Sequence, residues 1–495
     1  MMQPPSRRLL PLLVGPLLGA ICFVLAMAAS GGAQVGLDGP GWVVVGATLW
    51  MAVWWVSEAV PIGATSLLPM VVFPLAGITS AGNIAAPYFD KFVVLLMAGF
   101  MAALAIERWN LHRRLALTIL VALGTSPRRL IFGMMVATAI CSMWISNTAS
   151  TLIMLPIGLA IVTKLESESS DDPANAAAVA NFGTVLFLAI AYAASVGGLG
   201  TPVGTPPNMI FMAQYAKTFG TEPSFLDWMG YGLPCVIIGI PLLYLYLTRL
   251  GGKLPTQLPG GSRAMIRDEL KALGPMTKDE KAVAIVFGMM VLLWVTRAIK
   301  VDDEVYGWAS ALGIASYVHD STVAVAGAIV LFAFPSRTLP GERLLDWATA
   351  KRIPWDVVLL FGGGIALAVA FKDSGLSKTV SGALTGLAAV PVPVMILTIA
   401  LVVTFLTEVT SNTATTNILM PILAAFAFTD GLDPVHVMLP AVLSASCAFM
   451  LPVATAPNAI VYGTGRIPIS AMAKRGFLIN LGGAVIITLL VWLVF

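Results

Sequence analysis

Charged residues are scarce in this chain. Asp, Glu, Lys and Arg make up 11% of its 495 residues, whereas hydrophobic residues make up 58%. A soluble domain has roughly a quarter charged residues, so this chain lacks the side chains needed to cover a water-facing surface. Long apolar runs recur from end to end, and each is long enough to cross about 30 Å of hydrocarbon. We therefore expect an all-α polytopic protein whose surroundings are the lipid bilayer.

Other signatures are missing as well. The four cysteines lie singly in apolar runs without a C-x-x-C pair, which argues against disulfides and against a thiolate metal site. The net charge of +3 comes from basic residues in short loops rather than in a stripe, so we expect no nucleic-acid partner. A membrane enzyme would need His, Asp or Glu gathered at membrane depth, and the sequence shows no such cluster. We expect no catalytic residues and no enzymatic activity.

The apolar runs predict about eleven transmembrane helices and two hairpins. The expected spans are residues 9–29, 41–59, 61–78, 92–107, 179–212, 231–250, 281–298, 307–335, 354–371, 437–462 and 476–495. Two further stretches, 130–162 and 391–428, are interrupted midway by Ser, Asn and Thr. Irregular backbone at that depth is tolerated only where it lines a cavity or is buried in protein, so we expect two opposed re-entrant helical hairpins. Residues 9–29 follow Arg7-Arg8 and exceed the apolar part of a signal peptide, so we favour a retained span over the alternative of a signal peptide.

The sequence contains an internal repeat. Three motifs recur in the same order: Val-Val-Leu-Leu at 93–96 and 357–360, Ser-Asn-Thr-Ala at 146–149 and 411–414, and a polar break reading Gly-Thr-Pro-Pro-Asn at 204–208 and Ala-Thr-Ala-Pro-Asn at 454–458. We therefore divide the chain into four parts. They are an N-terminal span (1–40), a first repeat (41–250), a linker (251–280) and a second repeat (281–495).

Loop charges indicate that the two repeats are inserted in opposite directions. Segment 108–129 holds five basic residues and its counterpart 372–394 holds two, whereas 76–92 holds one and its counterpart 336–354 holds four. Lys and Arg accumulate on the cytoplasmic side, so equivalent loops face opposite sides. The linker carries five basic residues and is also expected to be cytoplasmic. With the N-terminus inside, eleven crossings leave the C-terminus outside.

The two hairpin tips share three polar residues. They are Ser146, Asn147 and Thr148 in the first hairpin and Ser411, Asn412 and Thr413 in the second. Their hydroxyl and amide groups suit carboxylate oxygens, and a half-helix that begins after each tip would direct free N–H groups and a positive dipole end at an anion. A single Ser-Asn-Thr is more often a helix cap or an interhelical hydrogen bond. Two copies, each within a hairpin and each followed by a break, favour a transport site near the membrane midplane.

Neither hairpin interior and neither break contains Arg or Lys. Holding a doubly charged anion with neutral donors alone would be costly in a low-dielectric site, and accompanying cations would offset that cost. Carbonyl, hydroxyl and amide oxygens suit Na⁺, so the residues favour sodium coupling over uncoupled passage. Glu408 is the acid at membrane depth near the motifs. It could titrate, but we expect it to hydrogen-bond locally and hold the second hairpin in shape.

These motifs resemble those of the divalent anion/sodium symporter family, which includes bacterial sodium–dicarboxylate symporters and animal di- and tricarboxylate carriers. The resemblance covers nearly the whole chain and includes Thr407-Glu408 ahead of the second tip. It implies a homodimer in which an elevator-type transport domain slides against a scaffold domain. We expect a bacterial inner membrane location.

The resemblance also implies roles for individual residues. Both Ser-Asn-Thr tips would contact the substrate carboxylates, aided by Thr205 and Thr455. Each repeat would hold one sodium ion: the first site comprises Ser142, Ser146, Asn147 and Gly204, and the second comprises Thr407, Thr410, Asn412 and Ala454. The repeat offset supports this pairing, since it relates Ser142 to Thr407. The family usually has a proline where this chain has Ala456, at a substrate-facing position.

We therefore expect sodium-coupled symport of C4-dicarboxylates such as succinate, malate or fumarate. A sodium-independent dicarboxylate exchanger is the closest alternative, followed by a symporter of another divalent anion such as sulfate or citrate. A channel belongs to a different class, and two symmetric halves around one site suit alternating access better.

Overall fold

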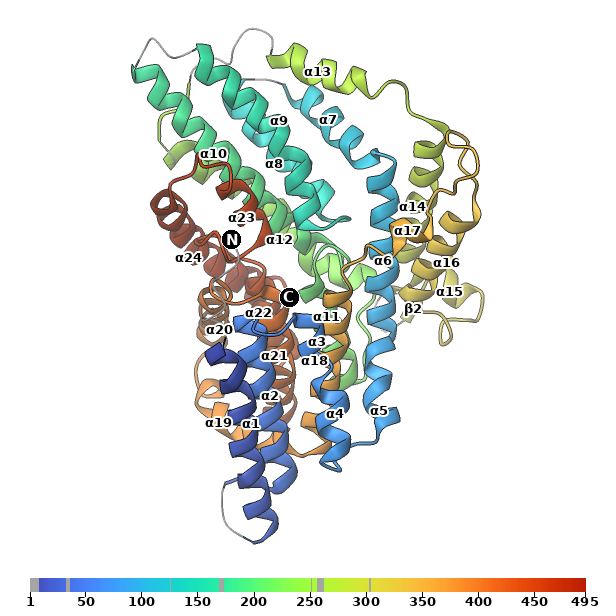
Figure 1. Cartoon of the computed structure of the whole chain (residues 1–495), viewed down its shortest axis with the longest axis vertical. Coiled ribbons are helices and arrows are strands. Elements are labelled where there is room, and N and C mark those ends of the chain that lie inside the picture. The colour runs from blue at the N-terminus through green and yellow to red at the C-terminus, as the bar shows by residue number, and fades with distance from the viewer. Residues whose placement is uncertain are drawn as a thin grey trace.

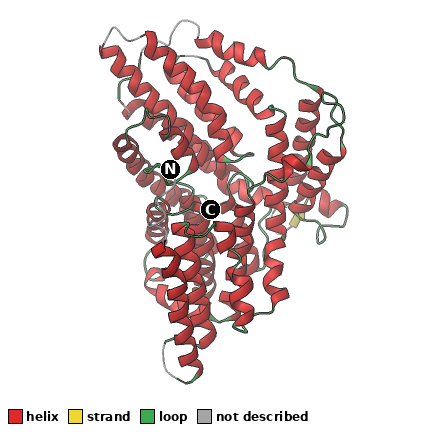
Figure 2. Cartoon of the chain, viewed as in Figure 1, coloured by secondary structure: helices red, strands yellow, loops and turns green. Residues whose placement is uncertain are grey.

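The computed structural model describes residues 9–32, 36–124, 126–168, 173–250, 252–255, 262–301 and 304–495, so Arg7 and Arg8 lie outside the described residues. The described chain is largely helical and includes one antiparallel pair of strands, β1 (Ile299–Val301) and β2 (Glu304–Tyr306) (Figure 2). Eight of the described helices are long and apolar enough to cross a membrane. Four shorter apolar helical stretches accompany them: Ile62–Leu75, Asp320–Ala333, Val392–Thr407 and Pro434–Ala445. Helices suit the bilayer because they satisfy their backbone hydrogen bonds internally.

The N-terminal span is α1 (Leu9–Ser30), which packs along α2. The helices of the first half are α2 (Gly39–Ser57), α3 (Ile62–Thr65), α4 (Leu68–Leu75), α5 (Ala81–Ala85), α6 (Lys91–Arg108), α7 (Leu111–Leu123), α8 (Pro127–Ser142), α9 (Asn147–Glu168), α10 (Pro173–Gly197), α11 (Pro206–Phe219) and α12 (Phe225–Leu245). The linker contributes α13 (Ser262–Ala272). The helices of the second half are α14 (Lys278–Arg297), α15 (Trp308–Ala311), α16 (Asp320–Ala333), α17 (Trp347–Ala350), α18 (Trp355–Asp373), α19 (Leu376–Ala388), α20 (Val392–Thr407), α21 (Asn412–Asp430), α22 (Pro434–Ala445), α23 (Ala456–Tyr462) and α24 (Ile469–Leu493).

Two predicted spans are divided in the structure. The span expected over 179–212 consists of α10, a 3₁₀ turn at Gly198–Gly200 and α11, and the span expected over 437–462 consists of α22 and α23. Each later helix begins with proline in its first two positions. Proline is tolerated there because the first N–H groups of a helix have no intrahelical acceptor. The apolar runs located these segments, and the polar motifs at 204–208 and 454–458 predicted the interruptions that the structure shows.

The apolar pattern also missed helices that are partly polar. The expected span 307–335 is helical chiefly over α16, and α7, α13 and α19 were not predicted. Ion pairs fasten the linker region to α7: Arg113 contacts Glu269 on α13 at 2.6 Å, and Arg114 contacts Glu280 on α14 at 3.0 Å. These long-range pairs have no signature in local sequence.

The two hairpins occupy similar positions in the two halves. The helices α8 and α9 pack against α10, whose residues 182–197 are all buried. In the second half, α20 and α21 pack against α22. In Figure 1, α8, α9 and α10 lie in the upper part of the molecule and α20 and α21 lie in the lower part. The hairpins therefore approach the middle of the molecule from opposite ends.

Candidate functional site

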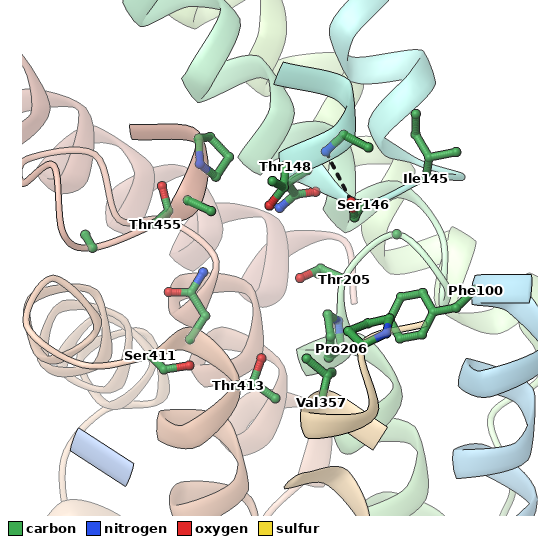
Figure 3. A pocket seen from close by; sticks show the side chains of 18 of the residues that line it. Phe100, Ile145, Ser146, Thr148, Thr205, Pro206, Val357, Ser411, Thr413 and Thr455 are labelled. Carbon is green, nitrogen blue, oxygen red and sulfur yellow. Dashed lines mark hydrogen bonds between the residues drawn. The ribbon is translucent and has the colours of Figure 1, made fainter. Parts of the chain in front are cut away.

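A cavity of about 1190 Å³ is lined by both hairpin tips and both breaks. Residues 145–149 and 409–413 supply the tips, and residues 204–206 and 453–457 supply the breaks. Figure 3 shows Ser146 and Thr148 on one side of the cavity and Ser411 and Thr413 on the other, with Thr205 and Thr455 beside them. Segments far apart in the sequence thus present hydroxyl and amide groups to one space.

The first tip is closed by side-chain hydrogen bonds. The helix α8 ends at Ser142 and α9 begins at Asn147. Ser142 Oγ lies 2.6 Å from Asn147 Oδ1 and 2.7 Å from the carbonyl oxygen of Ala194 on α10. Ser146 Oγ accepts a hydrogen bond from the Ala149 N–H at 3.2 Å. The first turn of α9 has N–H groups without intrahelical partners, and the first residues of this turn line the cavity.

The second tip repeats this arrangement. Thr407 Oγ1, at the end of α20, lies 2.6 Å from Asn412 Oδ1 and 2.9 Å from the carbonyl oxygen of Ala445 on α22. Thr410 adds a pair that has no equivalent at Ile145, because its Oγ1 lies 2.6 Å from Thr415 Oγ1. Both tips therefore join the end of one half-helix, the start of the next and a neighbouring helix carbonyl.

An asparagine organises each break. Asn208 Nδ2 donates to the carbonyl oxygens of Gly198 and Thr201 at 2.9 and 2.8 Å. Asn458 Nδ2 donates to the carbonyls of Ala448 and Leu451, both at 3.1 Å. The two amides thus reach the carbonyls ten and seven residues earlier, and hold the non-helical backbone in the same shape.

The backbone of the first break is also closely packed. A Cβ added at Gly204 would lie 2.4 Å from the carbonyl oxygen of Gly198, so glycine is required there. Thr205 precedes α11 and Thr455 precedes α23, and Thr455 accepts a hydrogen bond from the Asn458 N–H at 3.2 Å. The breaks place backbone and hydroxyl oxygens beside the tips.

In each half, one buried hydroxyl lies within hydrogen-bonding distance of two acceptor oxygens, although it can donate to only one of them. Ser142 Oγ carries one hydrogen but contacts two acceptor oxygens, and Thr407 Oγ1 does the same. A cation among these oxygens would satisfy the second contact, and so would a rotated asparagine amide. Carbonyl oxygens at the ends of broken helices are the groups that coordinate Na⁺ in secondary transporters. The arrangement therefore suits a monovalent cation without acidic ligands.

Glu408 connects the second tip to other elements. Its Oε1 accepts from the N–H groups of Phe449 and Met450 and from Asn480 Nδ2, and its Oε2 accepts from the Leu451 N–H. These partners differ from the local ones expected from the sequence. Four donated hydrogen bonds match the acceptors of an ionised carboxylate. Glu408 thus ties the tip to the second break and to α24.

The structure brings most of the expected site residues together. Those that line the cavity are Ser146, Asn147, Thr148, Gly204, Thr205, Thr410, Ser411, Asn412, Thr413, Ala454 and Thr455. Ser142 and Thr407 lie behind the tips and are fully buried. The cavity wall also includes Glu58, Glu107 and Arg352, which lie at or near the ends of the predicted spans 41–59, 92–107 and 354–371. The carbonyls of Ala194 and Ala445 were missed because a backbone oxygen leaves no signal in residue type.

Comparison with known proteins places these features in context. The sequence profile of the family described as "Sodium:sulfate symporter transmembrane region" matches residues 15–495. A protein from Staphylococcus saprophyticus named sodium-dependent dicarboxylate transporter SdcS is 41% identical over 481 residues, which is 97% of this chain and 91% of the relative. Its namesake from Staphylococcus aureus strain MSSA476 is 42% identical over 483 residues with the same coverages. The crystal structure of the YdaH transporter from Alcanivorax borkumensis matches with a TM-score of 0.53 at 15% identity, covering 83% of this chain and 88% of that one, which indicates a related fold.

Proposed function

Because the chain belongs to the sodium:sulfate symporter family, we propose that it is a secondary transporter that carries C4-dicarboxylates together with sodium ions across a bacterial inner membrane. Its Staphylococcus relatives are named sodium-dependent dicarboxylate transporters. The substrate in this proposal is a small dianion such as succinate, malate or fumarate.

The shared cavity between two uncharged tips carries this proposal. One carboxylate would meet the hydroxyl, amide and N–H groups at Asn147, and the other would meet those at Asn412. Both residues begin a helix, so each carboxylate would lie at a positive dipole end. The charged side chains on the described wall are two glutamates and Arg352, so the wall does not neutralise a dianion. Cations must supply the missing positive charge.

We assign one sodium ion to each half of the site. The first would be held by Ser142, Ser146, Asn147 and Gly204, and the second by Thr407, Thr410, Asn412 and Ala454. The close oxygen–oxygen contacts at Ser142 and Thr407 that no proton can bridge support these positions. An ion between tip and break would order both before the substrate binds, so substrate affinity would depend on sodium concentration.

We also propose how the chain is arranged in the membrane. The segments 41–250 and 281–495 would be inverted repeats, with residues 251–280 as a cytoplasmic linker and the hairpins as re-entrant loops. We further propose eleven crossings with the N-terminus inside and the C-terminus outside, in a homodimer whose transport domain moves like an elevator. The matching hydrogen bonds of Ser142 and Thr407 support the repeat, and the loop charges support the inversion.

Uptake into proteoliposomes tests the function. Labelled succinate should accumulate only under an inward sodium gradient, and either Asn147→Ala or Asn412→Ala should abolish accumulation without preventing membrane insertion. Asn83→Ala is the matched control, because Asn83 is exposed on α5 and does not line the cavity. Counterflow without sodium dependence would replace symport by exchange. Stronger competition by sulfate or citrate than by succinate would replace the substrate class.

A further inference from the structure

A second cavity, of about 250 Å³, lies behind the breaks and between α10, α12 and α24. We call it the apolar groove; its wall includes Val196, Leu199, Cys235, Gly239, Leu478 and Gly482. Side chains at its edge face outward: Leu242 is 43% exposed and Leu478 is 55% exposed. Both α12 and α24 are long apolar helices, so this edge faces the hydrocarbon of the bilayer. Lipid chains are the solvent at such a surface.

Basic residues lie where the apolar groove reaches the helix ends. On α24, Lys474 and Arg475 precede Leu478 and Ile479 by one turn on the same helix face. Arg249 follows the groove residue Tyr246 in the π-helical turn Tyr246–Leu250, directly after α12. The Tyr246 hydroxyl donates to the Arg475 carbonyl oxygen at 3.4 Å, which brings the two helix ends together. Lys474 and Arg249 are both exposed.

We propose that the apolar groove binds an acyl chain of an anionic phospholipid whose phosphate contacts Arg249 and Lys474. Charge complementarity selects this occupant, because basic residues at the membrane surface attract anionic headgroups. The glycines on α24 leave space for the chain: a Cβ at Gly482 or Gly483 would have no atom within 4 Å. The apolar lining excludes a polar solute from the same space.

The wall of the apolar groove includes residues of the two segments that lead into the breaks of the transport site. Leu199 lies just before the first break, and Phe449 lies within the non-helical segment that leads to the second. The Phe449 N–H donates to Glu408, which fixes the second hairpin tip. A bound chain would therefore support both breaks from behind. This effect on transport rests on the proposed function, whereas lipid binding does not.

Native mass spectrometry of the full chain in detergent tests the proposal with phosphatidylglycerol and phosphatidylcholine as probes. The parent should retain phosphatidylglycerol at least tenfold more than phosphatidylcholine. Gly482→Phe fills the groove and should lower bound phosphatidylglycerol about tenfold. Gly288→Phe is the matched control, because Gly288 is an exposed helical glycine on α14 with equal space and lies outside the groove.

A double variant, Arg249→Gln with Lys474→Gln, tests the headgroup separately and should make the two lipids bind equally. Equal retention of both lipids by the parent, or undiminished binding by Gly482→Phe, would overturn the proposal. A change of oligomeric state in Gly482→Phe would also overturn it, since a second copy of the chain would then be the occupant. Unfolding temperatures of all variants confirm that binding is compared between folded proteins.

Discussion

Thr407 Oγ1 lies 2.6 Å from Asn412 Oδ1, across the hairpin tip that separates α20 from α21. Ser142 Oγ lies at the same distance from Asn147 Oδ1, across the hairpin tip between α8 and α9. In each half a buried hydroxyl joins the end of one half-helix to the first residue of the next. Removing the hydroxyl should therefore loosen the tip and remove a proposed sodium ligand together.

Replacing Thr407 should lower the affinity for sodium more than it lowers the maximal rate of transport. Thr407→Ala should raise the sodium concentration for half-maximal succinate uptake about tenfold, which corresponds to a loss of about 1.4 kcal/mol. Thr407→Ser keeps the hydroxyl and should remain close to the parent. Thr398→Ala provides the control, because Thr398 is an exposed residue on α20 whose hydroxyl donates to the Val394 carbonyl of the same helix. A lower maximal rate with unchanged sodium dependence would show that Thr407 only supports the fold.

Glu408 should act by position rather than by carrying a proton. Glu408→Gln places an amide NH₂ against backbone donors, and a buried donor left without an acceptor costs about 1–3 kcal/mol. We expect sodium-driven uptake to fall at least tenfold at every pH, with the shape of its pH profile unchanged. Asn480→Ala removes one of the donors to Oε1 and should have a milder effect, because Phe449 and Met450 still donate to that oxygen. A shifted pH profile in Glu408→Gln would instead indicate proton coupling.

The sequence predicts the centre of this site better than its surroundings. Ser146 and Ser411 were identifiable because a polar triplet inside an apolar stretch is costly unless it serves a site, and because it occurs twice. Arg352 was not identifiable, since it lies in the segment between α17 and α18 and lines the cavity only in the folded chain. Its sequence neighbours are those of an ordinary basic loop.

A similar limit applies to the fold. Continuous apolar runs predicted α1 and α6 close to their observed bounds, because hydrocarbon thickness fixes the length of such helices. The helix α7 carries Arg113 and Arg114 and gives no long apolar run, so it was missed. The motifs at 204–208 and 454–458 predicted the breaks, but not that α10 and α22 end several residues before them, at Gly197 and Ala445. The hydrogen bonds that stabilise these non-helical segments come from Asn208 and Asn458, each donating to carbonyls seven and ten residues away.

The cavity wall has Pro206 in the first half and Ala456 at the equivalent position of the second, and this difference should affect selectivity. Pro206 and Ala456 both begin a helix after a break and both line the cavity. Proline is tolerated at the first helical position, so Ala456→Pro should fold. The added ring would occupy cavity volume and should lower uptake of a bulkier tricarboxylate several-fold relative to succinate. Equal loss for both substrates would mean that Ala456 does not face the bound anion.

The contacts of Asp346, in the loop before α17, should make stability depend on pH. Hydrogen bonds from the Thr349 N–H and from the Arg108 guanidinium hold the pKa of Asp346 below its ordinary value. A lowered pKa in the folded state means that the carboxylate stabilises the protein above its unfolded pKa of about 3.9. This contribution is lost as the pH falls through the folded pKa. Asp346→Asn should therefore lower the unfolding temperature at pH 7 and approach the parent near pH 3.

The two replacements of Asp346 separate its charge from its role as a helix cap. Asparagine also caps helices, so Asp346→Asn removes only the ion pair, which at a partly exposed site contributes less than about 1 kcal/mol. Asp346→Ala also removes the acceptor for the Thr349 N–H and should cost about 1 kcal/mol more, and this part should persist at low pH. Thermal unfolding followed by tryptophan fluorescence in detergent measures both differences between pH 7 and pH 3. A constant gap between the parent and Asp346→Asn over this range would exclude the carboxylate charge as the cause, since only a titrating group gives a difference that closes with acid.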